Sequence, residues 1–481
     1  MTDRSNEPEV VVVGAGPAGI AAATMLLSQG ARVTLIDEMP EVGGQYYKQR
    51  LAARGLSRGR DLDERVEKSQ DRLAALHGER FTALTGTLVW GMFAPHQVAI
   101  LRGERADILK PHAVILAGGA MERAAAFPGW TLPGVVMAGG VQTLLGREGI
   151  LPGRRSLVAG TGPLLLAVAA EIAEAGGQVV GVVEGSQATA PLRHLHHFWG
   201  QMRRVKEAWD YRRILDRHDI PMHNGHVVIA ARGDGRVEEV TFAQVDPEWQ
   251  VLPETERTVA VDTLCLHFGF EALTEIARMV ECEVAYDPDR GGWYVAHDDG
   301  MRTSNAGIYV AGQIAGIGGA DLAESTGAMA GLSAARDLDL LGERAYTAQA
   351  GPLQRDIAHR RDIARVLNTI YSPGAALPDL VTPDTIICRC EEVTAGEIDA
   401  ALANGTVSIN DIKRRTRCGM GMCQSRVCSP IVRAYVERKV GATAEEVSLI
   451  TARPPLRPIP LGALADLSEE QVGDVMTVAD E

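Results

Sequence analysis

The sequence predicts an α/β protein with two Rossmann-type dinucleotide-binding domains, followed by a small helical module with a cysteine-bound metal centre. Three observations support this fold class. A strand, glycine loop, helix and strand open the chain at residues 9–45, and a similar pattern recurs at residues 156–184. Five of the seven cysteines then fall between Cys388 and Cys428. At 481 residues the chain is long enough for several domains.

The opening pattern has the features of a dinucleotide-binding βαβ unit. A run of four valines leads into Gly14, Gly16 and Gly19 at GxGxxG spacing. The first glycine permits a tight turn, the second lets the backbone approach a pyrophosphate, and the third allows the helix to pack closely on the strand. A second apolar run ends at Asp37, where a carboxylate can accept hydrogen bonds from a ribose. The cofactor contacts expected in this unit are Gly14, Gly16, Pro17, Ala18, Gly19, Asp37 and Glu38.

Composition and charge exclude several classes of function. The net charge of −14 argues against a nucleic-acid-binding surface and against a polybasic membrane anchor. Residues 10–31 are uncharged and long enough to span a bilayer, but they contain the glycine-rich phosphate turn, so a transmembrane segment is not expected. The polar start of the chain lacks the pattern of a secretory signal, which predicts a cytoplasmic protein. In that compartment a cysteine cluster indicates metal or redox chemistry rather than structural disulfides.

The second βαβ pattern repeats the first only in part. Gly160 and Gly162 match the first two glycines, but Leu165 takes the place of the third. Glu184 ends the second strand, and an acid there favours NAD over NADP. Two interpretations stay open: the domain binds NAD, or it is a scaffold whose nucleotide, if bound, never turns over.

The cysteine module begins with Cys388 and Cys390 in a CxC pair and continues with Cys418, Cys423 and Cys428. Thiolates suit either zinc or an iron–sulfur cluster. The CxC pair followed at a distance by CxxxxC resembles the 2Fe-2S module of bacterioferritin-associated ferredoxin. That resemblance implies the ligands Cys388, Cys390, Cys423 and Cys428 and leaves Cys418 spare. The spacing between Cys418 and Cys423 is also CxxxxC, so it stays open whether Cys418 or Cys428 completes the cluster.

Two further stretches resemble flavoproteins of the glutathione reductase type. Residues 109–119 resemble the strand that closes the first half of the FAD domain. Residues 303–336 resemble the segment with which the chain returns to that domain. The resemblance implies FAD, and it adds the contacts Gly44, Gln45, Val89, Ala117, Gly118, Gly312 and Gln313. Gln313 replaces the usual aspartate, and its amide can still bind a ribityl hydroxyl. Disulfide reductases of this fold need a redox cysteine pair near the flavin, and neither expected stretch has one, which excludes thiol–disulfide exchange.

Residues 117–142 and the TRCGMGMCQSRVC stretch resemble the FAD-dependent subunits of opine oxidases, hydrogen cyanide synthase and D-hydroxyproline dehydrogenases. This resemblance implies an electron-transfer subunit of a multi-subunit dehydrogenase of amines or amino acids. Its partners would be an amine-oxidase-like FAD subunit together with a small ferredoxin-like subunit. FMN at a subunit interface and peripheral association with a membrane are allowed. The alternatives are a stand-alone NAD(P)H-dependent reductase and a non-catalytic nucleotide-binding scaffold. No residue is identified as a catalytic acid or base.

The expected domain organisation follows from these motifs. It comprises a discontinuous FAD domain at residues 1–120 and 271–345, a second dinucleotide domain at 121–270, a helical linker at 346–382, the 2Fe-2S module at 383–455 and an extended, proline-rich tail at 456–481.

Overall fold

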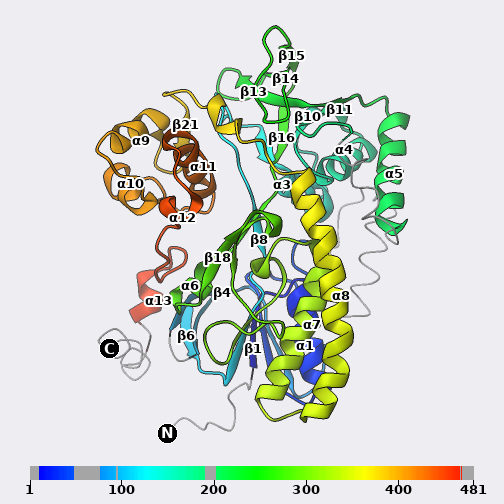
Figure 1. Cartoon of the computed structure of the whole chain (residues 1–481), viewed down its shortest axis with the longest axis vertical. Coiled ribbons are helices and arrows are strands. Elements are labelled where there is room, and N and C mark those ends of the chain that lie inside the picture. Colours follow the sequence, from blue (N-terminus) through cyan, green and yellow to red (C-terminus); the bar gives the residue numbers. More distant parts are fainter. Residues whose placement is uncertain (1–9, 48–75, 94–95, 190–201, 466, 468–481) are drawn as a thin grey trace.

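The computed structural model describes residues 10–47, 76–93, 96–189, 202–465 and 467. It contains two stacked α/β units, a small helical unit beside the second of them, and a long helix that runs along both (Figure 1). The predicted fold class is confirmed. Parts of the expected FAD domain and the end of the expected tail lie outside the described residues.

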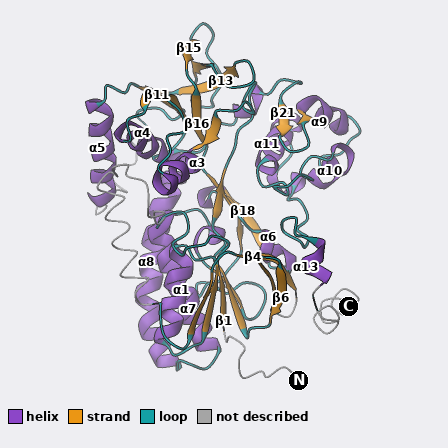
Figure 2. Ribbon diagram, turned by 180° about the vertical axis from the view of Figure 1, so that it is seen from behind, coloured by secondary structure: helices purple, strands orange, loops and turns teal. Residues whose placement is uncertain are grey.

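The first unit is centred on a five-stranded parallel sheet of order β20-β7-β1-β2-β3. Its strands are β1 (Val10–Val13), β2 (Val33–Ile36), β3 (Phe81–Leu84), β7 (Ala113–Leu116) and β20 (Ile308–Val310). Strand β20 follows the second unit along the chain, so the chain returns to the first unit to complete its sheet. An antiparallel sheet of β4 (Thr87–Phe93), β5 (Gln97–Arg102) and β6 (Arg105–Leu109) lies beside it (Figure 2).

Helices α1 (Pro17–Ser28) and α7 (Gly319–Asp337) pack against each other at unusually short range. A Cβ atom added at Gly327 would lie 2.1 Å from the carbonyl oxygen of Ala18, and one at Gly331 would lie 2.6 Å from that of Ala22. The two glycines are one helical turn apart, on the same face of α7. Their missing side chains therefore let the helix of the returning segment lie directly on the helix of the first βαβ unit.

The second unit is a parallel sheet of order β12-β11-β10-β16-β9. Its strands are β9 (Val135–Met137), β10 (Arg155–Gly160), β11 (Gln178–Glu184), β12 (Met222–Asn224) and β16 (Thr263–His267). Its helices are α3 (Ala138–Thr143), the π-helix Leu144–Glu148, α4 (Leu164–Glu174) and α5 (Met202–Arg217). An antiparallel sheet of β13 (His226–Arg232), β14 (Glu239–Gln244) and β15 (Arg257–Ala260) covers one end.

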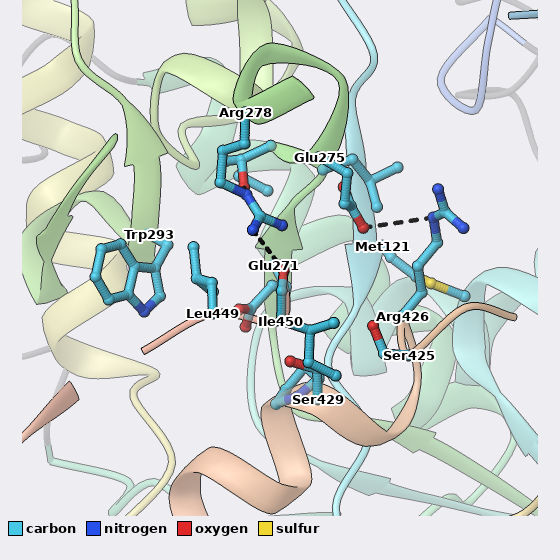
Figure 3. A pocket seen from close by; sticks show the side chains of 14 residues that line it. Met121, Glu271, Glu275, Arg278, Trp293, Ser425, Arg426, Ser429, Leu449 and Ile450 are labelled. Atoms are coloured by element: carbon cyan, nitrogen blue, oxygen red, sulfur yellow. Dashed lines mark hydrogen bonds and ion pairs between the residues drawn. The ribbon is translucent and has the colours of Figure 1, made fainter. Parts of the chain in front are cut away.

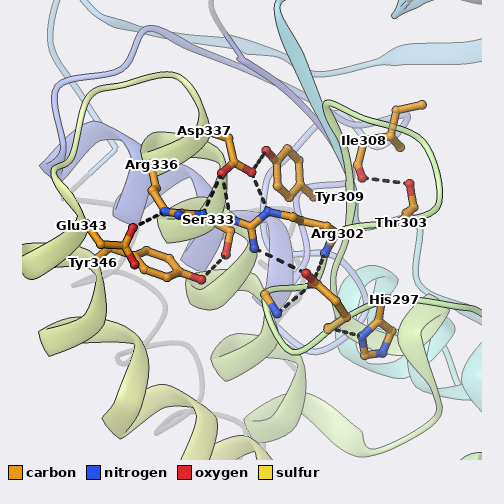
Figure 4. A network of polar contacts seen from close by, with 12 residues as sticks. His297, Arg302, Thr303, Ile308, Tyr309, Ser333, Arg336, Asp337, Glu343 and Tyr346 are labelled. Atoms are coloured by element: carbon orange, nitrogen blue, oxygen red, sulfur yellow. Dashed lines mark hydrogen bonds and ion pairs between the residues drawn. The ribbon is translucent and has the colours of Figure 1, made fainter.

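Two antiparallel strands, β8 (Ala120–Glu122) and β17 (Phe270–Ala272), carry the chain between the two units. After them come α6 (Glu275–Met279), β18 (Val284–Asp287), the 3-10 turn Pro288–Arg290, β19 (Gly292–Val295) and the 3-10 turn Gly312–Ala315. A bidentate ion pair fixes this returning segment on α7: the Arg302 guanidinium donates to Asp337 at 2.6 and 2.8 Å, and the Tyr309 hydroxyl donates to the same carboxylate at 2.6 Å (Figure 4).

The expected helical linker is an integral part of the fold. Helix α8 (Glu343–Ile370) buries Ala350, Ile357, Ile363 and Ala364 and packs along α7. At its end, the Ile370 carbonyl accepts a hydrogen bond from Ser186 of the second unit at 3.1 Å. Helix α8 packs on α7 because its apolar face is stable only when another element covers it.

The cysteine module contains β21 (Ile386–Cys388), β22 (Val393–Thr394), α9 (Ala395–Leu402), α10 (Ile409–Thr416), α11 (Cys428–Val440) and α12 (Ala444–Val447). Its buried residues are continuous with those of the second unit. Trp130 of the second unit donates its indole N–H to the Ile386 carbonyl at 2.6 Å. Arg389 lies 5.1 Å above the Trp130 ring and donates to the Trp130 carbonyl at 3.0 Å. The module is therefore held firmly in place.

The tail crosses the antiparallel sheet of the first unit. The Leu456 amide donates to the Trp90 carbonyl at 2.6 Å. Ile459, Leu464 and Leu467 pack against the buried cluster of Trp90, Ala99 and Ile108. The expectation of a wholly extended tail is wrong over Leu461–Ala465, which forms helix α13. Leucine and alanine are strong helix formers, and Pro460 directly precedes them, where a proline costs no intrahelical hydrogen bond.

None of the helices in the described part of the chain is both long enough and apolar enough to cross a bilayer.

The contact between Trp130 and the cysteine module generates a prediction. Trp130→Phe removes the N–H that binds the Ile386 carbonyl and leaves that acceptor unpaired, which costs about 1–3 kcal/mol. We expect faster amide hydrogen exchange in residues 383–455, measured by mass spectrometry. Trp209→Phe is the control, because Trp209 is 65% exposed. Equal exchange in the two variants would contradict the assigned role of Trp130.

Candidate nucleotide sites and cysteine cluster

The first glycine loop is shaped by close backbone contacts. Gly14 has a positive φ of 104°, and a Cβ atom there would lie 2.3 Å from the Ala117 carbonyl oxygen. A Cβ atom at Gly19 would lie 1.8 Å from the Gly14 carbonyl oxygen. At Gly16, by contrast, the nearest atom to an added Cβ is the Gly44 Cα at 3.9 Å. Gly14 and Gly19 are thus required by the protein itself, and Gly16 leaves space that a pyrophosphate can enter.

Asp37 holds the loop in place. Its carboxylate accepts the Ala15 amide at 2.6 Å and the Met39 amide at 2.8 Å. Burial raises the pKa of Asp37, and the two backbone hydrogen bonds oppose that shift. The remaining lone pairs of the carboxylate are available to a ribose. Beside it, Glu38 forms an ion pair with Arg457 of the tail at 2.8 Å.

Other expected contacts gather around the same loop. Gly44 packs on Gly16, with an added Cβ only 2.7 Å from the Gly16 Cα, and the neighbouring Gly43 amide donates to the Ala15 carbonyl at 2.8 Å. Ala117 follows β7 and is buried. The Gly118 amide lies 3.5 Å from a Cβ added at Gly14. Two other residues predicted to contact the cofactor differ in their exposure: Gln45 is exposed, and Val89 is buried in the core of the first unit.

The turn after β20 reaches this site from the other side. An added Cβ at Gly312 would lie 2.8 Å from the Ala18 Cβ, so the turn touches the first residues of α1. The Gly312 amide donates to Thr326 at 2.9 Å, and the Gln313 side-chain oxygen accepts the Gly318 amide at 2.9 Å. Gln313 therefore stabilises the loop that leads into α7, a role the sequence did not reveal. Its amide N–H₂ can still donate to a ligand.

The second glycine loop is held by contacts with the ends of two neighbouring strands, β16 and β11. An added Cβ at Gly160 would lie 1.8 Å from the His267 carbonyl oxygen. Glu184 accepts the Gly162 amide and the Ser186 amide, both at 2.9 Å, and burial raises its pKa. Leu165 is 1% exposed and packs in the core of this unit. A cavity of about 150 Å³ lies against Glu184, and Leu165 is among the residues that line it.

Tyr371 also lines that cavity, and sequence reasoning missed it. It follows the last residue of α8, and burial, followed by the charge of Glu184, raises its pKa to about 12. Sequence reasoning also missed the buried pair of Glu122 and His267, whose Oε1 and Nδ1 atoms are 2.8 Å apart between the two units. None of these three residues belongs to a recognisable motif, because their contacts join segments far apart in the chain.

The five cysteines form two groups. Cys388, Cys418 and Cys428 are buried, with sulfur atoms all within 4.8 Å of one another. Hydrogen bonds from Cys418 and then Cys428 lower the pKa of Cys388, whereas the contacts of Cys428 with Cys388 and then Cys418 raise the pKa of Cys428. Cys390 is exposed and Cys423 half-buried, and their side chains contact each other. The predicted spare thiol, Cys418, thus lies with two of the predicted ligands, and the other two ligands form a pair.

This donor set fits a thiolate-bound metal centre. Soft sulfur donors select iron–sulfur clusters or zinc, and these five thiols lie on two facing segments. A Cβ at Gly421 would lie 2.1 Å from the Cys390 Cβ, so only glycine allows the two segments to approach. The four-cysteine ligand set stays a prediction.

The cysteine loop is anchored to the first unit across a small cavity of about 40 Å³ (Figure 3). Arg426 lies between Cys423 and Cys428; it donates to the Cys423 carbonyl at 3.2 Å and forms an ion pair with Glu275 of α6 at 3.5 Å. Arg278 of α6 donates to the Ile450 carbonyl at 2.7 Å, and burial lowers its pKa. The cysteine loop and the first unit are therefore directly connected.

The two remaining cysteines, Cys265 and Cys282, are 0% and 4% exposed. Burial raises the pKa of both thiols, which makes them poor nucleophiles.

Comparison with known proteins adds family information. Residues 8–340 match the model of the pyridine nucleotide-disulphide oxidoreductase family, and residues 383–467 match that of the sarcosine oxidase A3 domain. The chain is 34% identical to the A subunit of opine oxidase from Rhizobium meliloti strain 1021, over 96% of this chain and 99% of the relative. It is 32% identical to the HcnB subunit of hydrogen cyanide synthase from Pseudomonas aeruginosa, over 96% and 99%.

Among solved structures, L-proline dehydrogenase from P. horikoshii has a TM-score of 0.69 at 20% identity, covering 95% of this chain and 79% of that one. At this identity the likeness concerns the fold.

The glycine loop generates a matched pair of predictions. Gly19→Ala places a methyl group on the Gly14 carbonyl, and we expect it to lower the free energy of unfolding by about 1–3 kcal/mol. The methyl group of Gly16→Ala has room, so the stability of the apoprotein should change by about 0.5 kcal/mol or less. We expect Gly16→Ala nevertheless to weaken FAD binding about tenfold or more, because the methyl group blocks the pyrophosphate. Chemical denaturation and fluorescence titration with FAD measure the two effects. Unchanged FAD affinity in Gly16→Ala would contradict nucleotide binding at this loop.

The cysteine groups generate a second prediction. Cys388 and Cys428 belong to both the predicted set and the buried trio, so Cys388→Ser and Cys428→Ser should each lose bound iron and labile sulfide. If the predicted set holds the cluster, Cys390→Ser loses it as well and Cys418→Ser retains it. Iron and sulfide analysis with electron paramagnetic resonance measures the outcome. Loss in Cys418→Ser with retention in Cys390→Ser would instead assign the buried trio as ligands.

Proposed function

The chain belongs to the pyridine nucleotide-disulphide oxidoreductase family and is a relative of the opine oxidase A subunits, and on this premise we propose that it is a flavin and iron–sulfur electron-transfer subunit of a multi-subunit dehydrogenase of amines or amino acids. A partner FAD subunit would remove the electrons from a C–N bond of the substrate. This chain would pass them to an acceptor.

One observation carries this proposal. The cysteine loop is attached directly to the flavoprotein-like unit by the contacts of Arg426 and Arg278, rather than by a free linker. Electron transfer between two centres needs a fixed distance, and buried charged contacts of this kind supply it. Truncating one partner of such a contact leaves a buried charge unpaired, so the arrangement resists opening.

The residues of the first unit fit a nucleotide cofactor, and the proposed cofactor is FAD. Gly16 would admit its pyrophosphate, Asp37 would accept hydrogen bonds from its ribose, and the Gln313 amide would reach the ribityl chain. When bound, FAD supplies a carrier that accepts electrons in pairs and releases them singly. The contacts of the glycine loop with Ala117 and Gly44 would fix its position.

The cysteine module would hold a 2Fe-2S cluster on Cys388, Cys390, Cys423 and Cys428. Such a cluster supplies one-electron transfer, with a potential set by hydrogen bonds to its sulfurs and by burial. The Gly419 amide, which points at the Cys388 sulfur from 3.5 Å, is one such donor. Arg417 and Glu391 form an ion pair at 3.0 Å beside the module's CxC pair and would add to the local field.

The partners and location follow the same proposal. Two relatives, of the opine oxidase and hydrogen cyanide synthase type, are themselves named as subunits, which supports an assembly of more than one chain. We propose that the partner is an amine-oxidase-like FAD subunit, with a small ferredoxin-like subunit plus an interfacial FMN completing the complex. The proposed compartment is the cytoplasm, and the complex would bind a membrane only peripherally.

A second candidate function is a stand-alone NAD(P)H-dependent reductase. The cavity at Glu184 favours it, because an acid at this strand end can bind the ribose of NAD. Against it, Ser186 is bonded to the end of α8, and Tyr371 occupies part of the cavity wall. A scaffold with structural nucleotides is the third alternative.

An anaerobic titration of the purified chain with NADH and NADPH tests the proposal. Flavin, iron and labile sulfide are quantified first, and flavin absorbance is followed during the titration. We expect the flavin and cluster to be present and to stay oxidised, because electrons should arrive through the partner subunit. The same chain purified with its partner should be reduced by the amine substrate. Rapid stoichiometric bleaching by NADH alone would overturn the proposal in favour of the reductase.

A further inference from the structure

Three nitrogen-bearing side chains from separate segments converge behind the Gly312–Ala315 turn. Arg290 ends the 3-10 turn after β18, His297 follows β19, and Arg361 lies on α8. Nη1 of Arg290 and Nη2 of Arg361 approach Nε2 of His297 at 3.3 and 3.4 Å. The segments are far apart in the sequence, so only the fold brings these groups together.

The hydrogen-bonding pattern favours a neutral imidazole in this group. A guanidinium can only donate hydrogen bonds, so the single lone pair of Nε2 is shared between the two arginines. Nδ1 of His297 contacts the Asp298 carbonyl at 2.8 Å and donates to it (Figure 4). Burial, and then the charges of Arg361 and Arg290, lower the pKa of His297, while hydrogen bonds to the Asp298 and Ala315 carbonyls oppose that shift.

The two guanidinium charges are poorly compensated. Arg290 has one carboxylate near it, Asp287 at 3.7 Å, and its guanidinium lies 4.4 Å from the centre of the Tyr294 ring. Arg361 makes no ion pair with any carboxylate of the described residues, and Asp299 acts on it only at longer range. Burial and then the neighbouring Arg290 lower the pKa of Arg361. Two like charges held on one neutral acceptor favour the binding of an anion between them.

The group is attached directly to the loop that leads into α7. The Ile317 amide donates to the Arg290 carbonyl at 2.8 Å. Asn368 of α8 donates its side-chain amide to the Ile317 carbonyl at 3.1 Å and to the Asp289 carbonyl at 3.0 Å. The arginines are thus held by backbone contacts on a rigid support, as a binding site requires.

We propose that Arg290, Arg361 and His297 form an anion-binding site that takes the phosphate or carboxylate group of a ligand. The planar forks of two arginines match the oxygens of either group, and the neutral His297 fixes the forks in place. The inference goes beyond the proposed function, because it requires neither a partner chain nor the iron–sulfur cluster. A phosphate would come from a mononucleotide such as FMN, and a carboxylate from an amino acid.

Isothermal titration calorimetry of the full chain, at constant ionic strength, tests this site with inorganic phosphate, FMN and acetate as probes. We expect Arg361→Gln and Arg290→Gln to weaken binding of the preferred probe about tenfold or more, since each removes a charge-assisted hydrogen bond. Arg365→Gln is the matched control: Arg365 lies one turn further along α8 and pairs with Asp362 at 3.3 Å. Its effect should be about twofold or less.

The probes distinguish the two sources of the anion. Tighter binding of phosphate and FMN than of acetate supports a phosphate ligand, and equal or tighter binding of acetate supports a carboxylate ligand. A second readout is thermal unfolding in buffer free of such anions, where Arg361→Gln should be at least as stable as the wild type because it relieves repulsion. Equal binding by wild type, Arg361→Gln and Arg290→Gln, or no binding to the wild type at about 10 mM probe, would overturn the proposal.

Discussion

The structure depends on one close approach between backbones, where the first glycine loop passes the end of β7. Gly14 and Gly19 bring the carbonyl groups of the loop and of Ala117 within a distance that no side chain would permit. This contact fixes how α1 starts, and the start of α1 fixes where Gly312 and Gly327 must lie. The first unit is therefore assembled from two distant parts of the chain through a series of glycine contacts. Its nucleotide loop is the place where these contacts meet.

Helix α8 connects the parts that carry chemistry. Its central turns support Arg361, Asn368 joins it to the loop before α7, and its last residues reach Ser186 and the cavity beside Glu184. A sequence pattern describes such a helix only as charged and amphipathic. In the fold it packs along α7 of the first unit and reaches Ser186 of the second, so it connects the two α/β units directly.

The cysteine module is positioned by polar contacts as much as by its apolar core. Trp130 and Arg389 hold it on the second unit, and Arg426 and Glu275 join its cysteine loop to the first. A further buried contact between Arg433 and Glu271, with Arg123 3.6 Å from the same carboxylate, lies at the same boundary. Buried ion pairs add little net stability, but they strongly penalise alternative arrangements. That property suits the proposed exchange of electrons between this module and a flavin.

The sequence by itself determined the fold class, the two glycine loops, the acids at Asp37 and Glu184, and the thiol-rich module. Each of these features depends on the spacing of residues that are close together in the chain, and local backbone geometry follows from that spacing. Tertiary structure decided the rest. It placed Cys418 beside Cys388 and Cys428, gave Gln313 a structural role, brought Tyr371 to the second cavity and gathered Arg290, His297 and Arg361 into one group. These contacts join residues far apart in the chain, and no local pattern encodes them. They arise only when apolar faces and glycine contacts force distant segments to pack together.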